Sequence, residues 1–142
     1  MRVTELIVHC TATREGREVE KAELCRWHKA RGMADIGYHY LIHLDGRVDA
    51  CRSETKVGAH CLGHNAKSLG ICYVGGLAAD GRTPKDTRTE AQRTALRKLL
   101  LTLHGKYPTA TVHGHNEFAA KACPCFNVQT DAACWPWKRS QT

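Results

Sequence analysis

Two short runs of apolar residues, at positions 6–8 and 69–74, lie far apart in the chain, and a segment with helical periodicity follows each of them. Uninterrupted apolar runs of this length are typical of strands that are buried on both faces of a sheet. Strands that alternate with helices along a chain form a sheet with the helices packed against its faces. The sequence therefore predicts an α/β or α+β fold with a single mixed central sheet flanked by helices.

Turn and capping signals divide the chain into further elements. Residues 45–46 (DG) are a strong hairpin signal between two strand-like segments. Residues 89–92 (TEAQ) fit a helix capping box, and apolar residues then recur at helical spacing until Gly105. We expect the order β-α-β-β-β-α-β-α, with strands over 4–10, 38–44, 47–51, 69–74 and 109–113, helices over 18–31, 89–105 and 126–135, and a long irregular connection over 52–68.

The chain is 142 residues long and shows no internal repeat and no linker rich in proline, glycine or serine. This length predicts one domain over 1–142. Lysine and arginine number 21 against 14 aspartate and glutamate residues, a formal charge of +7. That charge favours a polyanionic partner such as nucleic acid, an anionic membrane surface or an anionic cell-wall polymer. Because the basic residues are scattered among acidic ones and form no nucleic-acid-binding motif, we expect no nucleic-acid partner.

The eight cysteines have the pattern of neither a disulfide framework nor a zinc ribbon. The N-terminus has no signal-peptide core, and no later apolar run is long enough to span a membrane. We therefore expect synthesis in the cytoplasm, where thiols stay reduced, and no membrane insertion. Cys123 and Cys125 have C-x-C spacing rather than the C-x2-C of a ribbon. A metal site must therefore combine ligand types from distant segments, and the remaining cysteines are interpreted as small buried hydrophobic residues.

Three residues at the ends of expected elements have the chemistry of metal ligands. His9 ends the first strand, His115 follows the last strand, and Cys123 comes eight residues later in a loop that contains proline. Sites in sheets of this kind form at strand ends. Two imidazoles and one thiolate would leave the fourth position of a catalytic zinc ion open. Such a site keeps a net charge near +1, which is enough to acidify a water molecule.

Eight short blocks carry a resemblance that covers about residues 3 to 130: VHCTAT (8–13), WHK (27–29), GYHY (37–40), DG (45–46), VGAH (57–60), NAKSLGIC (65–72), GHNE (114–117) and KACP (121–124). In this order and spacing the chain resembles the zinc-dependent N-acetylmuramoyl-L-alanine amidases. This family includes phage lysozymes of the amidase type and is related to the peptidoglycan recognition proteins. Each block alone is weak, but eight in register form a specific signal.

The resemblance implies a role for each matching residue. One zinc ion per chain would be held by His9, His115 and Cys123, and Tyr38 and Lys121 would assist catalysis. Lys121 could stabilise the negative charge of a tetrahedral intermediate. Tyr38 could orient the attacking water or pass a proton to the leaving amine. Because the ordinary pKa of tyrosine is about 10, we favour the orienting role. The alternatives are a strand tyrosine and a solvated lysine.

Other residues in the matching blocks allow more than one interpretation. His60 and Asn65 match positions near the substrate groove of the family, so both are candidate substrate-binding residues. His39 could pack in a strand or steady a ligand, and packing is favoured. His113 is interpreted as a non-ligand although it precedes His115 by two positions. Cys125 could compete for metal, form a disulfide on oxidation or pack in its loop.

The function that the resemblance implies is hydrolysis of the amide between the lactyl group of N-acetylmuramic acid and L-alanine in bacterial peptidoglycan, by a phage or prophage endolysin. The basic charge suits an anionic wall. Other branches of the family use an acidic residue as general base, and we identify no counterpart of it in this sequence. The chain is therefore assigned to the branch in which cysteine is the third zinc ligand. Alternatives are a non-catalytic peptidoglycan-binding protein and an additional role as inhibitor of a phage RNA polymerase. We expect a monomer that reaches the wall after membrane permeabilisation.

Overall fold

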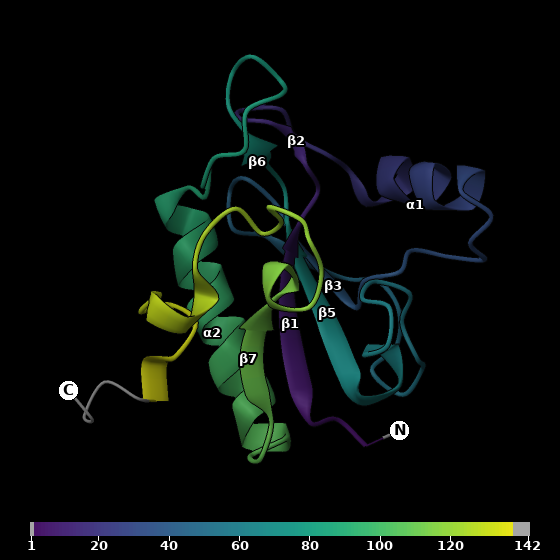
Figure 1. Cartoon of the computed structure of the whole chain (residues 1–142), viewed down its shortest axis with the longest axis vertical. Helices are drawn as coiled ribbons and strands as arrows, with labels where there is room; N and C mark the ends of the chain where they lie inside the picture. The colour runs from purple at the N-terminus through teal and green to yellow at the C-terminus, as the bar shows by residue number, and fades with distance from the viewer. Residues whose placement is uncertain (1, 138–142) are drawn as a thin grey trace.

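A computed structural model of the chain describes residues 2–137. The fold centres on a five-stranded mixed sheet (Figure 1). The strand order is β4-β3-β5-β1-β7, and all neighbours are parallel except the antiparallel hairpin of β3 and β4. The expected single central sheet is confirmed. Its strands are β1 (Glu5–Cys10), β3 (Tyr40–Ile42), β4 (Val48–Ala50), β5 (Ser68–Tyr73) and β7 (Thr111–Gly114).

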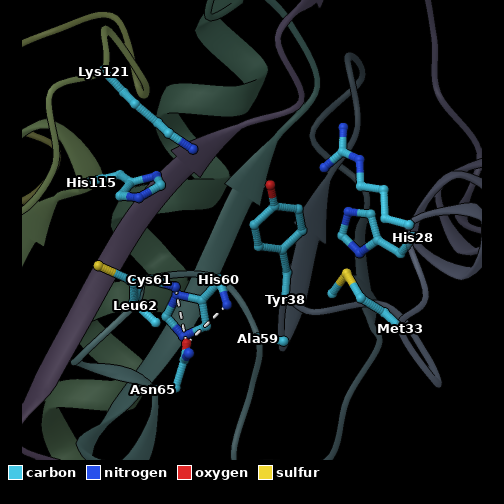
Figure 2. A pocket seen from close by; sticks show the side chains of 11 residues that line it. His28, Met33, Tyr38, Ala59, His60, Cys61, Leu62, Asn65, His115 and Lys121 are labelled. Atoms are coloured by element: carbon cyan, nitrogen blue, oxygen red, sulfur yellow. Dashed lines mark hydrogen bonds between the residues drawn. The ribbon is translucent and has the colours of Figure 1, made fainter.

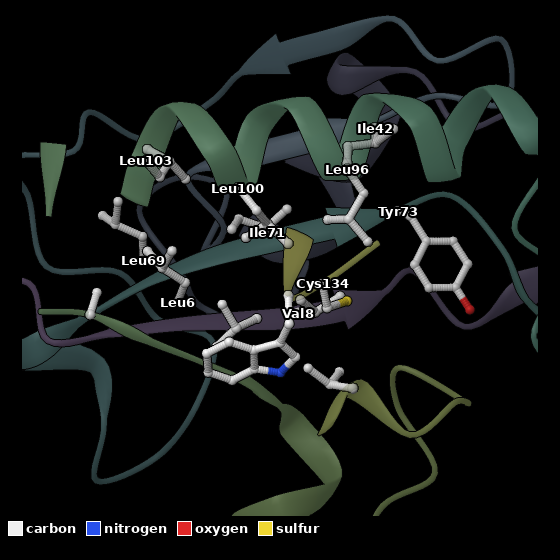
Figure 3. Close-up of a cluster of buried hydrophobic side chains, with 14 of the residues drawn as sticks. Leu6, Val8, Ile42, Leu69, Ile71, Tyr73, Leu96, Leu100, Leu103 and Cys134 are labelled. Carbon is white, nitrogen blue, oxygen red and sulfur yellow. The ribbon is translucent and has the colours of Figure 1, made fainter. Parts of the chain in front are cut away.

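One face of the sheet packs against the long helix α2 (Glu90–Lys106), as Figure 3 shows. The helix begins as the sequence predicts, because the Thr89 side chain accepts a hydrogen bond from the backbone N–H of Gln92 and the Gln92 side chain accepts one from that of Thr89. Apolar side chains from alternate positions of the strands fill the space beneath the helix. They include Leu6, Val8, Leu69, Ile71 and Tyr73, which contact Leu96, Leu100 and Leu103 of α2.

The opposite face of the sheet forms a second, smaller core beside α1 (Lys21–Ala30). Leu24 of the helix packs with Leu41 of β3 and Cys72 of β5. Because side chains alternate along a strand, His9 of β1 points to this second face, away from α2. Because both faces of the sheet are covered by other parts of the protein, β1 and β5 contain continuous runs of apolar residues.

The C-terminal part of the chain corrects one expectation. The helix predicted over 126–135 is wrong: the structure has only a 3-10 turn, η3 (Val128–Thr130). The side chain of Asn127 accepts from the backbone N–H of Gln129, and Asp131 is extended and pairs with Arg88. These contacts favour an irregular segment that places Cys134 in the core. Tertiary contacts thus override the local helical pattern.

Smaller differences concern element lengths. The strands of the hairpin are shorter than predicted, and α1 begins at Lys21 rather than at residue 18. A two-residue parallel pair, β2 (Thr13–Arg14) and β6 (Gly76–Leu77), lies outside the predicted strands. Strands of two residues are too short to produce a periodic pattern. The connection over 52–68 is irregular as expected, apart from the 3-10 turn η1 (Asn65–Lys67).

The eight cysteines are free thiols in the structure. Cys10, Cys61, Cys72 and Cys134 are buried, which agrees with their interpretation as packing residues, and the others are half-buried. Over residues 2–137, no helix has the length and apolar character that a membrane span requires.

Candidate metal centre

The carboxyl ends of β1 and β7 bring two histidines together. The strands are parallel, and Val8 pairs with Gly114, so the residues that follow each of them emerge at the same edge of the sheet. His9 is the next residue of β1, and His115 starts the 3-10 turn η2 (His115–Glu117). The loop after η2 brings in Cys123. One ligand atom from each of the three side chains lies within 4.8 Å of the other two.

Hydrogen bonds fix the orientation of the His9 ring. Its Nε2 atom lies 2.8 Å from Nδ1 of His60, and its Nδ1 atom lies 3.8 Å from Sγ of Cys123. The nitrogen that faces the cluster is therefore Nδ1. Burial lowers the pKa of His9, and it lowers the pKa of His60 to about 2, with the neighbouring histidines adding to the effect. Both rings are neutral at pH 7, as a metal-ligating imidazole must be.

The backbone around His60 is built to hold this ring. Asn65 Oδ1 accepts hydrogen bonds of 2.9 Å from the backbone N–H groups of His60 and Cys61 (Figure 2). Ser68 Oγ lies 3.3 Å from the Nε2 atom of His60. A Cβ atom at Gly70 would lie 2.7 Å from Cγ of His60, so only glycine leaves room for the ring above β5. His60 and Asn65 line the pocket, and they also make these contacts inside the protein.

Cys123 is prepared to carry a negative charge. Hydrogen bonding with Cys10, then with His115 and His9, lowers the pKa of the Cys123 thiol to about 3, although burial opposes the shift. The backbone N–H of Cys10 donates to Cys123 Sγ over 3.3 Å. A thiolate and two imidazoles within reach of one another match the donor set of a catalytic zinc site. These three residues therefore fit a zinc ion.

A pocket of about 320 Å³ opens beside this cluster. Figure 2 shows Tyr38 between His28 on one side and the group of His60, His115 and Lys121 on the other. The ring of Tyr38 lies 5.0 Å from that of His9, and burial raises the pKa of its phenol, which is protonated at neutral pH. Lys121 is exposed at the pocket wall. The pocket thus combines a hydrogen-bond donor and a cation beside the candidate metal ligands.

Other histidines have partners away from the cluster. The ring of His39 accepts from the backbone N–H of Gly70 and lies 2.8 Å from the carbonyl oxygen of Lys56, which supports its packing role. His113 lies 2.9 Å from Glu117, because the chain turns into η2 after β7 and separates it from His115.

Cys125 approaches Cys10, since its Sγ atom is 3.9 Å from that of Cys10. It is not one of the three residues whose ligand atoms converge.

Sequence reasoning assigned no role to several pocket residues. His28 is buried, its Nδ1 atom accepts from the backbone N–H of Gly37, and its ring lies 5.3 Å from that of Tyr38. Arg31 and Met33 line the same end of the pocket. His28 belongs to the WHK block, so the resemblance could have pointed to it. Arg31 and Met33 follow at the end of a helix and in a loop, where no periodic pattern marks a residue as part of a pocket.

Comparisons with known proteins agree with this geometry. The family model for N-acetylmuramoyl-L-alanine amidase matches residues 1–126. The endolysin of Escherichia phage T7 is 44% identical over 124 residues, which cover 87% of this chain and 82% of that protein. The endolysin of Enterobacteria phage K11 is 42% identical over 126 residues, which cover 89% and 83% of the two chains.

Solved structures show the same fold. The N-acetylmuramoyl-L-alanine amidase LysC from Clostridium intestinale superposes with a TM-score of 0.77 at 28% identity, over 89% of this chain and 79% of that one. The match of the family model over most of the sequence and the close endolysin relatives agree with the resemblance seen in the motifs. The chain belongs to the N-acetylmuramoyl-L-alanine amidase family.

Proposed function

We propose that this protein hydrolyses the amide bond between the lactyl group of N-acetylmuramic acid and L-alanine in bacterial peptidoglycan, as a phage or prophage endolysin that uses one zinc ion per chain. The observation that carries the proposal is the convergence of His9, His115 and Cys123 at the wall of a pocket that also holds Tyr38 and Lys121. Family membership and the endolysin relatives supply the reaction class.

The residues of the cluster would hold the metal through His9 Nδ1, a ring nitrogen of His115 and the Cys123 thiolate. A zinc ion held there supplies Lewis acidity, which polarises a carbonyl and makes water a usable nucleophile near neutral pH. His60 keeps the His9 ring in its orientation through the 2.8 Å contact. Asn65 fixes the loop that carries His60.

Tyr38 and Lys121 act on the substrate in this proposal. The protonated phenol of Tyr38 can donate a hydrogen bond that orients the reacting groups. The ammonium group of Lys121 lines the pocket and can stabilise the negative charge that develops on the carbonyl oxygen. His60 and Asn65 also line the pocket, and we propose that both contact the substrate there.

The cellular setting follows from the proposed reaction. We infer synthesis in the host cytoplasm and access to the wall after a separate protein permeabilises the membrane. The monomeric state and a role as inhibitor of a phage RNA polymerase stay predictions from the resemblance. A purely binding role is disfavoured by the presence of the thiol at position 123 together with Tyr38 and Lys121.

The test is digestion of purified peptidoglycan before and after treatment with a chelator, with the products identified by mass spectrometry. We expect free stem peptides that begin with L-alanine, no release after chelation, and recovery when zinc is added back. Cleaved glycan strands would contradict the amidase, and release that persists without metal would contradict the zinc.

A matched pair of variants connects the activity to the cluster. Cys123→Ser should lose bound zinc and activity together, because it removes the thiolate ligand. Cys51→Ser is the control, since Cys51 is also a half-buried free thiol, packs against the second core and is not one of the three residues whose ligand atoms converge. Equal zinc content and activity in the two variants would contradict the assignment of Cys123.

A further inference from the structure

The pocket beside the candidate metal centre is lined by two cationic side chains, Arg31 and Lys121, and by no acidic one. Over residues 2–137, neither the guanidinium of Arg31 nor the ammonium of Lys121 takes part in a hydrogen bond or an ion pair with another side chain. Two uncompensated positive charges that face one cavity attract an anionic ligand. In the proposed function Lys121 acts at the reacting carbonyl. Arg31 is then the pocket cation for which no ligand group has been named.

Arg31 lies at the end of the pocket that is remote from the metal ligands. It caps the C-terminus of α1, where its backbone N–H donates to the carbonyl of His28 over 3.1 Å. Burial, and then the positive charge of Arg31, lower the pKa of His28, so the guanidinium is within electrostatic range of that ring. The chain therefore places a cation near His28 at the pocket.

The spacing of the rings sets a length scale along the pocket. The ring of Tyr38 lies 5.0 Å from that of His9. On its other side it lies 5.3 Å from the ring of His28, which Figure 2 shows beside it. An extended peptide advances about 3.3–3.6 Å per residue. With the scissile carbonyl beside His9, the second residue of a bound stem peptide would lie about 7 Å away, near His28 and Arg31.

The second stem residue is a D-glutamyl unit that is joined to the next residue through its side-chain carboxyl group. Its α-carboxyl group is therefore either a free carboxylate or an amide. We propose that Arg31 binds this α-carboxylate and thereby selects stem peptides in which it is not amidated. The inference rests on the proposed amidase function. A guanidinium donates two parallel hydrogen bonds to a carboxylate, and the neutral amide offers neither the charge nor the second acceptor.

The experiment compares two synthetic N-acetylmuramoyl tripeptides that differ only in D-glutamate or D-isoglutamine at the second position. For the zinc-loaded wild-type protein we expect kcat/KM to be about tenfold higher for the carboxylate form, mainly through KM, which is the size of one exposed charge-assisted contact. Arg31→Gln should bring the ratio close to one by raising KM for the carboxylate form alone. Arg31→Lys should keep part of the preference, since it retains the charge but loses the planar fork.

Arg26→Gln is the matched control, because Arg26 is an exposed arginine of the same helix that does not line the pocket. It should keep the wild-type ratio. The inference is overturned if Arg31→Gln keeps the preference or if Arg26→Gln loses it to the same extent, and in both cases the amidase function stands. Release of stem peptide from neither substrate by the wild-type protein would instead refute the proposed function.

Discussion

The Nδ1 atom of His60 lies 2.8 Å from the Nε2 atom of His9, and both rings are buried. The contact joins a loop residue to the carboxyl end of strand β1, across 51 positions of sequence. It occupies the ring nitrogen of His9 that faces away from Cys123 and so determines which nitrogen is left for a metal. A partner of this kind fixes both the tautomer and the orientation of a ligating histidine.

Replacement of His60 by alanine should therefore weaken metal binding. We expect His60→Ala to lower zinc affinity by about 10–100-fold, the usual effect of removing such a partner. Competition with a chromophoric chelator measures this directly. His113→Ala should bind zinc as the wild type does, because the ring of His113 contacts Thr111 and Glu117 instead. Unchanged affinity in His60→Ala together with a raised KM would show that His60 acts only on the substrate.

Lys121 should affect the rate of the reaction but not the metal. Its side chain lines the pocket and is not one of the three candidate ligands. We expect Lys121→Ala to lower kcat by about 100-fold, the size of one lost electrostatic stabiliser, with full zinc content by elemental analysis. Lys98→Ala, on the exposed face of α2, is the control for loss of one surface charge. A variant of Lys121 that loses zinc along with activity would contradict the separation of roles.

Local sequence patterns were sufficient to predict the strands and the helix that form the centre of the fold. The strands β1 and β5 carry continuous apolar runs because both faces of the sheet are covered, and the capping box of α2 is complete within residues 89–92. The convergence of His9 and His115 also followed from local order, since parallel strands end at one edge. These features depend on neighbours in the sequence or on one rule of sheet topology.

Features that depend on distant contacts could not be predicted. The helix expected over 126–135 does not form, because the side chain of Asp131 is used by Arg88, which is 43 positions away. The contact of His60 with His9 and the approach of Arg31 to the pocket also arise from contacts between residues that are far apart in sequence. No periodicity marks such residues, since their positions follow from how loops fold back onto the sheet.

The buried Arg88 offers a test of that C-terminal segment. Its guanidinium is almost fully buried, contacts Asp86 and Asp131 at 2.9 and 2.5 Å and lies 3.5 Å above the ring of Phe126. Removing one partner of a buried ion pair leaves uncompensated charge, so we expect Arg88→Met to lower the free energy of unfolding by about 3 kcal/mol. Urea denaturation measures the change. Arg97→Met, at an exposed position of α2, should change stability by less than about 0.5 kcal/mol, and equal effects would contradict the role of the ion pair.

His43 should make stability depend on pH. Its buried ring lies 2.9 Å from Glu18 and 2.7 Å from Asp49 and so ties the hairpin to the segment before α1. Burial lowers the pKa of His43, but the two carboxylates outweigh this effect and raise the pKa above its ordinary value of 6.5. A raised folded-state pKa means that the contribution is complete below about pH 6.5 and is lost as the pH rises through the folded-state value.

Urea denaturation of the wild type and of His43→Gln between pH 5 and pH 9 isolates this contribution from those of the other histidines. We expect the variant to be less stable by about 1–3 kcal/mol at the acidic end, because two carboxylates lose their shared donor. The difference should shrink as the pH rises. Glu18→Gln should move the decline to lower pH, since it removes one of the two groups that raise the pKa of His43. A difference that stays constant, or that grows with pH, would show that His43 is neutral in the folded protein.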